Sequence, residues 1–444
     1  MNQPFPRRSI PAAPLSRRLL KPLERFFEIE ASSGIVLLAA TAAALLWANS
    51  RWHASYESLW HVTIELSLGA HHWAASPHFL VNDGLMTIFF LLVGLEIRRE
   101  LHDGALSSGR AAVVPIVAAL GGMLAPALIY LAVAGPEVRR GWAIPTATDI
   151  AFAIGALTLL AKRVPPSARL LLLALAVIDD IGAILIIAFF YSSGIDVLGL
   201  WIAAGGLGGV WLFQRLGIRS MLAYLLAGLV IWIGLHAAGL HPTLSGAILG
   251  LLVPVQAPPL RAATRELRAP AERLQLALHP WVAYGIMPLF ALANAGVALE
   301  GVTFTAPGVV ALTIAIVLAL VLGKPLGIAL CTWLATRSGF SALAPGLDGR
   351  GVLLVGCFGG IGFTMSLFLA TLAFDDPTLL AAAKVAVLLG SALSGIGGFV
   401  LGRAVLFPHR AELASSGSSG MAQAHSLESR GDRGALHHTH KHEW

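Results

Sequence analysis

Apolar residues occur along this chain in long unbroken blocks that short polar stretches separate. Blocks such as residues 36–47, 170–178 and 311–323 lack the alternation of polar and apolar positions that marks soluble helices and strands. A helix of about 20 apolar residues is long enough to cross a bilayer. The pattern therefore predicts an all-α integral membrane protein with about twelve transmembrane helices. Their expected positions are residues 34–48, 79–97, 111–133, 142–160, 168–190, 197–213, 220–236, 240–254, 280–298, 307–333, 351–373 and 381–402.

The composition supports lipid as the solvent of this chain. Apolar residues make up 57% of it and charged residues 12%, and this charged share is about half that of an ordinary soluble protein. The basic residues form short clusters between apolar blocks, without interleaved aromatic residues, so they predict membrane topology and no nucleic-acid partner. Cys331 and Cys357 lack the spacing of a zinc site or a disulfide framework. No resident cofactor is expected.

The basic residues also predict the orientation of the chain. An even number of spans places both termini on one side of the membrane, and cytoplasmic connections carry an excess of lysine and arginine. That excess precedes the first span and recurs in alternate connections, so both termini are predicted to be cytoplasmic. The basic residues that decide this are Arg7, Arg8, Arg17, Arg18, Lys21, Arg98, Arg99, Lys162, Arg163, Arg215, Arg219, Arg265 and Arg268.

Residues 28–407 are predicted to form one membrane domain between an N-terminal tail (1–27) and a polar C-terminal tail (408–444) that cannot bury a core. A cleaved signal peptide is the alternative at the start, but the long charged leader favours a retained helix. Two connections are long enough to be structures in themselves, residues 51–78 outside and 256–279 inside. The first is expected to be an interfacial hairpin, a partner surface or a plain interfacial loop.

Four ionisable residues lie deep inside apolar blocks, where each costs about 2.5 to 3.5 kcal/mol to insert. They are Asp149, Asp179, Asp180 and Lys324. Three acids and one base leave a surplus of negative charge near the middle of the membrane, which suits a cation. A structural ion-pair cluster that only orients helices is the alternative, but one lysine balances a single acid and leaves the others uncompensated.

The adjacent pair Asp179 and Asp180 is especially informative. Consecutive helical residues point about 100° apart, so one carboxylate can meet Lys324 while the other lines a water-filled cavity. Desolvation and like charge both penalise the second ionisation, and either a proton or a small cation relieves that penalty. A carboxylate must lose its proton before it binds a hard cation. Competition of this kind is the chemistry of an ion exchanger.

The fourth and eleventh predicted spans are expected to be interrupted. Pro145 and Thr148 lie inside the fourth apolar block, and Gly359, Gly360 and Gly362 lie inside the eleventh. Small-residue packing is the alternative for the glycines. Each interrupted span is the second of a triplet (three, four, five and ten, eleven, twelve). This placement predicts inverted repeats with two crossed discontinuous helices, which meet at an ion site in the middle of the membrane.

Six long motifs in this order resemble the NhaA family of bacterial sodium/proton antiporters, over about residues 28–406. That family is itself an example of the inverted-repeat plan, so the two observations are not independent. The motifs are NDGLMTIFFLLVGLEIRREL (82–101), GWAIPTATDIAFAIG (141–155), LALAVIDDIGAILII (173–187), LHPWVAYGIMPLFALANAGV (278–297), GKPLGI (323–328) and GGIGFTMSLF (359–368).

The resemblance implies electrogenic exchange of two protons for one Na+ or Li+ by alternating access, in the bacterial inner membrane. It implies that Asp180 is the principal ion-binding carboxylate and that Asp179 pairs with Lys324. Thr148 and Asp149 would complete the cation environment at the helix break. A homodimer through the outward segment 51–78 is also expected from the family.

The family's pH-sensing cluster is matched by Glu96, Arg99 and Glu100 at the end of the second span, and a further pH-linked position by His241. The match is incomplete, because Glu272, Gln275 and Leu276 stand where a lysine, a glutamate and a histidine are expected. We therefore expect shifted or weaker pH activation. Without the resemblance, Glu96 to Glu100 is equally consistent with a charged helix end at the interface.

Two other functions fit part of this pattern. An intramembrane aspartyl protease also buries two acids, but on separate helices, and this chain lacks a Gly-x-Gly-Asp motif. A sodium-driven symporter of an organic solute on the same crossed-helix plan is the closer alternative. Lys324 and the paired acids argue against it, since they supply protonatable groups without an evident organic pocket. Asp375 and Asp376 repeat the paired acids, but Pro377 follows them, so a solvated turn is expected there.

Overall fold

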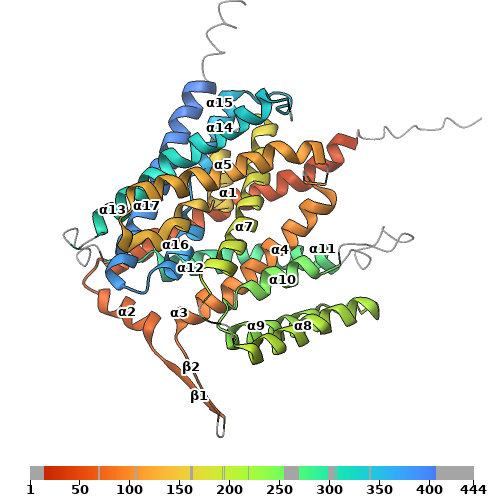
Figure 1. Cartoon of the computed structure of the whole chain (residues 1–444), viewed down its shortest axis with the longest axis vertical. Helices are drawn as coiled ribbons and strands as arrows, with labels where there is room; N and C mark the ends of the chain where they lie inside the picture. Colours follow the sequence, from red (N-terminus) through yellow and green to blue (C-terminus); the bar gives the residue numbers. More distant parts are fainter. Residues whose placement is uncertain are drawn as a thin grey trace, which may run out of the picture.

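The computed structural model describes residues 15–406 apart from residues 69–70, 105, 108, 161–163, 193, 195, 219, 255–269, 299–305, 307 and 340–341. Within this part the chain is a bundle of helices with one small β-hairpin (Figure 1). The elements are α1 (Leu15–Ala48), α2 (His53–His61), β1 (Ile64–Leu68), β2 (His71–Ala75), α3 (Pro77–Phe79), η1 (Leu80–Leu85), α4 (Met86–Asp103), α5 (Gly109–Val133), η2 (Pro136–Thr146), α6 (Ile150–Leu159), α7 (Pro166–Phe190), α8 (Val197–Arg215), α9 (Met221–Ala237), α10 (Leu244–Leu252), α11 (Pro270–Trp281), η5 (Val282–Ile286), α12 (Met287–Asn294), α13 (Val309–Leu318), η7 (Ala319–Gly323), α14 (Lys324–Arg337), α15 (Gly349–Gly359), α16 (Phe363–Ala373) and α17 (Pro377–Leu406).

The helices agree with a multi-pass membrane protein. In the described part, 7 helices are long and apolar enough to cross a membrane, or up to 10 if each bent helix pair is one span. Helices α9 and α10 are shorter, with 17 and 9 residues. Each of the apolar blocks found in the sequence contains helix, but the total of twelve spans stays a prediction. Large apolar side chains such as Phe189 and Trp201 are exposed on the outside of the bundle, where lipid would cover them.

Both predicted tails extend beyond what the structure describes. Residues 1–14 and 408–444 lie outside the described residues. Helix α1 begins at Leu15, so its first turns belong to the segment expected as the N-terminal tail. The basic residues Lys162, Arg163, Arg219, Arg265 and Arg268, which helped to predict the topology, also lie outside the described residues.

The first long connection forms a hairpin that projects from the helical body (Figure 1). Helix α2 turns 113° away from α1, and β1 then pairs antiparallel with β2, with Ile64 opposite Ala75. Tyr56 on α2 donates to Leu292 O at 2.8 Å and lies 3.1 Å from Ala293 O. These bonds hold α2 against the end of α12. We call this end of the molecule the hairpin end.

Helices α5 and α14 cross at a pair of glycines. A Cβ atom on Gly121 would lie 2.3 Å from Gly327 O, and a Cβ atom on Gly327 would lie 2.2 Å from Gly121 O. Real side chains do not tolerate such distances, so the two backbones approach as closely as only glycine permits. This contact places Lys324, one turn before Gly327, deep inside the bundle.

The crossing gives a first testable prediction. Replacing Gly327 by alanine should force α5 and α14 apart and destabilise the protein by about 1 to 3 kcal/mol, because an added methyl group in a closely packed interior causes steric strain. Thermal unfolding of the purified protein in detergent measures the change. Gly205→Ala on α8 is the matched control, since a Cβ atom there meets nothing within 4 Å. Equal melting temperatures for the two variants would contradict the close crossing.

Two discontinuous helices meet near the centre of the bundle. One is η2 with α6, bent by 57°, and the other is α15 with α16, bent by 48°. Across the breaks, Asp149 N donates to Ile361 O at 2.8 Å, and Thr148 Oγ1 lies 2.9 Å from Gly359 O. The crossed, interrupted helices predicted from the sequence are therefore confirmed. Gly360 is required at its place, because a Cβ atom there would lie 2.4 Å from Leu320 O.

Candidate ion-binding site

Asp149 joins the two helix breaks. It caps the N-terminus of α6, where Oδ1 accepts from Phe152 N at 3.0 Å. Its second oxygen, Oδ2, accepts from Thr364 N at 3.1 Å and from the Thr364 hydroxyl in the first turn of α16. The N-termini of two short helices thus point at one buried carboxylate. The positive ends of both helix dipoles therefore lie toward this carboxyl group.

Asp179 is held in a buried ion pair. Lys324 Nζ lies 2.6 Å from Asp179 Oδ2, and both side chains are fully buried. The Thr148 hydroxyl also lies 2.6 Å from Asp179 Oδ2 and contacts Lys324 Nζ. Lys324 begins α14 directly after η7, a short stretch of π-helix, a feature often found at functional sites. The lysine therefore neutralises this one acid and leaves the neighbouring acid unmatched.

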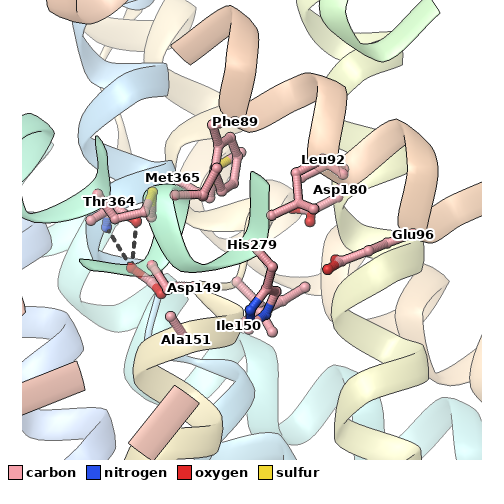
Figure 2. Close-up of a pocket in the computed structure, with 15 residues that line it drawn as sticks. Phe89, Leu92, Glu96, Asp149, Ile150, Ala151, Asp180, His279, Thr364 and Met365 are labelled. Carbon is pink, nitrogen blue, oxygen red and sulfur yellow. Dashed lines mark hydrogen bonds between the residues drawn. The ribbon is translucent and has the colours of Figure 1, made fainter. Parts of the chain in front are cut away.

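Asp180 has a different environment from Asp179. It lines a cavity of about 50 Å³ together with Glu96, Thr148, Asp149 and Thr364. Asp180 Oδ1 is buried and has no hydrogen-bond partner among the described residues. In the view of Figure 2, Asp149 and Thr364 lie on one side of the cavity, Glu96 lies on the other, and Asp180 lies between them. A cavity of this size holds a few water molecules or a partly hydrated ion.

The oxygen atoms around the cavity are those that a hard cation prefers. Carboxylate oxygens of Asp149 and Asp180 and hydroxyl oxygens of Thr148 and Thr364 are contributed by α6, α7, the fourth-span break and α16. Within the described part of the chain, no group of three or more histidine, cysteine, aspartate and glutamate residues is placed to hold a metal ion. The cavity therefore groups carboxyl and hydroxyl oxygens of the kind that bind a small cation.

The structure brings the five predicted transport residues together but separates the predicted pH-regulation residues. Glu96 lines the cavity, on the face of α4 that also presents Phe89, Leu92 and Val93. Arg99 and Glu100 follow about one turn later on α4, beyond the cavity lining. His241 lies in the turn between α9 and α10, also away from the cavity, and its Nδ1 is buried without a hydrogen-bond partner among the described residues.

Two polar residues of the cavity, Thr364 and His279, were not among the site residues predicted from the sequence. Thr364 binds Asp149 and follows the glycines of the eleventh-span break by two residues, so its place in the GGIGFT motif was the available signal. His279 lines the cavity and is buried near the end of α11. It lies one residue before the span predicted at residues 280–298, so its place in the motif LHPWVAYGIMPLFALANAGV was the available signal.

The three departures from the family pattern lie on α11 before His279. Glu272 is exposed and Leu276 is 53% exposed, while Gln275 is half-buried. Gln275 and His279 are four residues apart and share a face of the helix. Gln275 is also the least exposed of the three.

Comparisons with known proteins identify the family of this chain. A family model described as Na+/H+ antiporter 1 matches residues 24–401. The Na+/H+ antiporter NhaA 2 of Sorangium cellulosum (strain So ce56) is 52% identical over 438 residues, which cover 90% of this chain and 94% of that protein. The Na+/H+ antiporter NhaA of Acidovorax sp. (strain JS42) is 54% identical over 404 residues, which cover 89% and 96%. The chain therefore belongs to the Na+/H+ antiporter 1 family, whose members are transporters rather than enzymes.

Proposed function

We propose that this chain is a secondary active transporter that exchanges Na+ or Li+ for protons, two protons for each cation, by alternating access at the cavity between the helix breaks. The observation that carries the proposal is the contrast between the two adjacent acids. Asp179 has a buried lysine partner at Oδ2 and does not line the cavity, whereas Asp180 lines the cavity and forms no ion pair within the described part of the chain. A carboxylate in that position either keeps a proton or exchanges it for a cation.

In this mechanism Asp180 is the principal cation ligand. Asp149 and Thr148 supply further oxygens at the helix break, and Lys324 holds Asp179 so that one carboxylate remains for the ion. Protons and Na+ compete for the same oxygens, which couples their movement in opposite directions. The cavity of about 50 Å³ has room for an ion and a few water molecules, which favours ion exchange over cotransport of an organic solute.

Everted membrane vesicles test the proposal directly. Vesicles from cells without other Na+/H+ antiporters, containing this protein, are energised by respiration so that their interior becomes acidic. Addition of NaCl or LiCl should collapse the proton gradient, reported by a fluorescent amine, whereas choline chloride should not. Between about pH 7 and pH 9, protons compete least with Na+ or Li+ for the buried acids. If the protein is present in the membrane but neither cation changes the gradient in this range, the proposed exchange is wrong.

We also propose that Glu96, Arg99, Glu100 and His241 adjust the activity to pH. Glu96 supports this role best, since it lines the ion cavity itself. The exposed Glu272 and Leu276 and the half-buried Gln275 change the charge of the neighbouring helix from the family pattern. We therefore expect activation at a shifted pH, or a weaker activation by pH, than in relatives that carry lysine, glutamate and histidine there.

The proposed setting is the bacterial inner membrane, with both termini in the cytoplasm and the hairpin end outside. The arginine residues near the end of α4 and in the first turn of α1 support this orientation. The projecting β-hairpin leaves strand edges open for pairing, so we propose a homodimer through residues 51–78. Its hydrogen-bonding edges suit a second copy of the same hairpin.

A further inference from the structure

A cluster of polar side chains lies at the hairpin end, apart from the ion cavity. Asn82 on η1 and Asn294 at the end of α12 are buried and face one another. Asn294 Nδ2 donates to Asn82 Oδ1 at 2.8 Å, and Asn82 Nδ2 donates to Asn294 Oδ1 at 3.4 Å. The second hydrogen of Asn82 Nδ2 points to His78 Nε2 at 3.2 Å. The second hydrogen of Asn294 Nδ2 goes to Phe290 O at 3.1 Å.

This cluster lies between the outside and the cavity. Asn82 and Glu96 are 14 residues apart on η1 and α4, which corresponds to about 21 Å along the helix axis. Between the asparagines and the cavity lies an aromatic layer, in which the ring centroids of Phe90 and Phe368 are 5.6 Å apart and those of Phe290 and Phe368 are 6.3 Å apart. The same elements, α4 with η1 and α12, carry both layers.

We propose that His78, Asn82 and Asn294 form a pH-sensitive latch on the outward pathway, closed while His78 is neutral and released when His78 is protonated. The proposal rests on the proposed antiport function, because it assigns the outward gate of that transport. We call these three residues the latch.

The hydrogen bonds explain the sign of the effect. Asn82 donates to an imidazole nitrogen, and only a neutral ring has a nitrogen that accepts. A protonated ring donates from both nitrogens, so it no longer accepts from Asn82 and instead competes with Asn82 for the side-chain oxygen of Asn294, its other hydrogen-bond partner. Loss of that acceptor, or rotation of the Asn82 amide to turn its oxygen toward His78, weakens the bonding between Asn82 and Asn294. A low external pH therefore opens the latch, and it does so when the external proton concentration is high.

Other charged groups surround His78 and influence its protonation. His61 on α2 stacks on it with ring centroids 5.6 Å apart, and Lys384, buried on α17, lies within electrostatic reach of both His78 and Glu57. On its own segment the nearest acid is Asp83, and α9 presents His236 beside Phe79. Among these, only His78 is hydrogen-bonded to the asparagine pair in the described part of the chain, so it is the group that connects protonation to the latch.

A cysteine accessibility experiment tests this inference. Met86 is fully buried, one turn from Asn82 and one turn from Phe90, so a cysteine at Met86→Cys reports whether the latch is open. The variant is made with Cys331→Ser and Cys357→Ser and is treated, in right-side-out vesicles, with a membrane-impermeant thiol reagent. Val62→Cys, exposed at the same end, corrects for the pH dependence of the reagent.

The ratio of labelling at position 86 to labelling at position 62 should rise at least threefold from about pH 8 to about pH 4, because burial and the neighbouring Lys384 and His61 oppose protonation of His78 until the medium is more acidic than an ordinary histidine requires. His78→Gln keeps an acceptor but cannot be protonated, so its ratio should stay low at both pH values. Asn82→Ala and Asn294→Ala remove the latch, and each should give a high ratio at both pH values. Because two variants remove the latch, the test remains possible if one of them fails to fold.

His61→Gln is the matched control, because it removes a neighbouring imidazole that is not bonded to the asparagines; its ratio should still rise at acid pH. A ratio in His78→Gln that rises as in the parent would overturn the latch, and so would loss of the rise in His61→Gln. Na+-dependent collapse of a proton gradient is measured on the parent in parallel. If that collapse is absent, the proposed function fails; if it is present and the labelling is independent of His78, only the latch fails.

Discussion

Replacing Asp180 by asparagine should abolish Na+-dependent and Li+-dependent loss of the proton gradient in everted vesicles. Asparagine preserves the size of the side chain but carries no charge and takes up no proton, so position 180 can neither bind the cation tightly nor exchange it for H+. Because Lys324 already compensates Asp179, no other acid in α7 replaces Asp180. We expect transport to fall at least a hundredfold, to the background of vesicles without the protein.

The matched control is Asp375→Asn. Asp375 also belongs to a pair of adjacent acids, but it is exposed in the turn before α17. This variant should transport as the parent does. Binding of Na+ to purified protein, followed by calorimetry, separates the causes: Asp180→Asn should show no heat of binding at alkaline pH. Normal transport by Asp180→Asn would mean that the cation is bound elsewhere.

Replacing Lys324 by methionine should destabilise the protein by about 3 to 5 kcal/mol, because Asp179 is then left as a buried charge without a partner. Methionine has a similar length and no charge, so the loss of the ion pair is the main change. Thermal unfolding of the purified variant in detergent measures it. Arg337→Met removes a cation from the exposed end of the same helix and should cost less than about 1 kcal/mol.

The double variant Lys324→Met with Asp179→Asn separates charge from packing. Both charges are then gone, and replacement of a complete buried ion pair is often close to neutral. We therefore expect the double variant to recover most of the stability lost in Lys324→Met. If the double variant is as unstable as the sum of its single variants, the 2.6 Å ion pair is not the source of the stability.

The sequence was sufficient where the signal is local. Pro145 and the glycines at positions 359, 360 and 362 interrupt apolar blocks, and the structure has breaks at both places. Pro145 and Thr148 marked the place of the break in the fourth block, and the next residue, Asp149, is the N-cap of α6. Such features depend on a few neighbouring residues, so one sequence contains enough information to place them.

Contacts between distant segments could not be derived in this way. The residues alone did not decide which acid meets Lys324; the family resemblance named Asp179, and the structure has that pair. The hydrogen bond between Thr364 and Asp149 spans 215 residues and depends on the crossing of two helices. The strands β1 and β2 have five residues each, and the second is mostly histidine and alanine, so their hairpin stayed one of several alternatives.

The oxygens of Asp149 that are available to a cation are the same oxygens that connect α6 to α16. Its two oxygens fasten the start of α6 and the start of α16, two segments that no covalent bond joins nearby. A cation that binds to these oxygens must weaken at least one of the hydrogen bonds, and the bond reforms when the cation leaves. The strength of the connection between α6 and α16 is therefore expected to change each time the site fills or empties. No other residue is needed to link ion binding to this change.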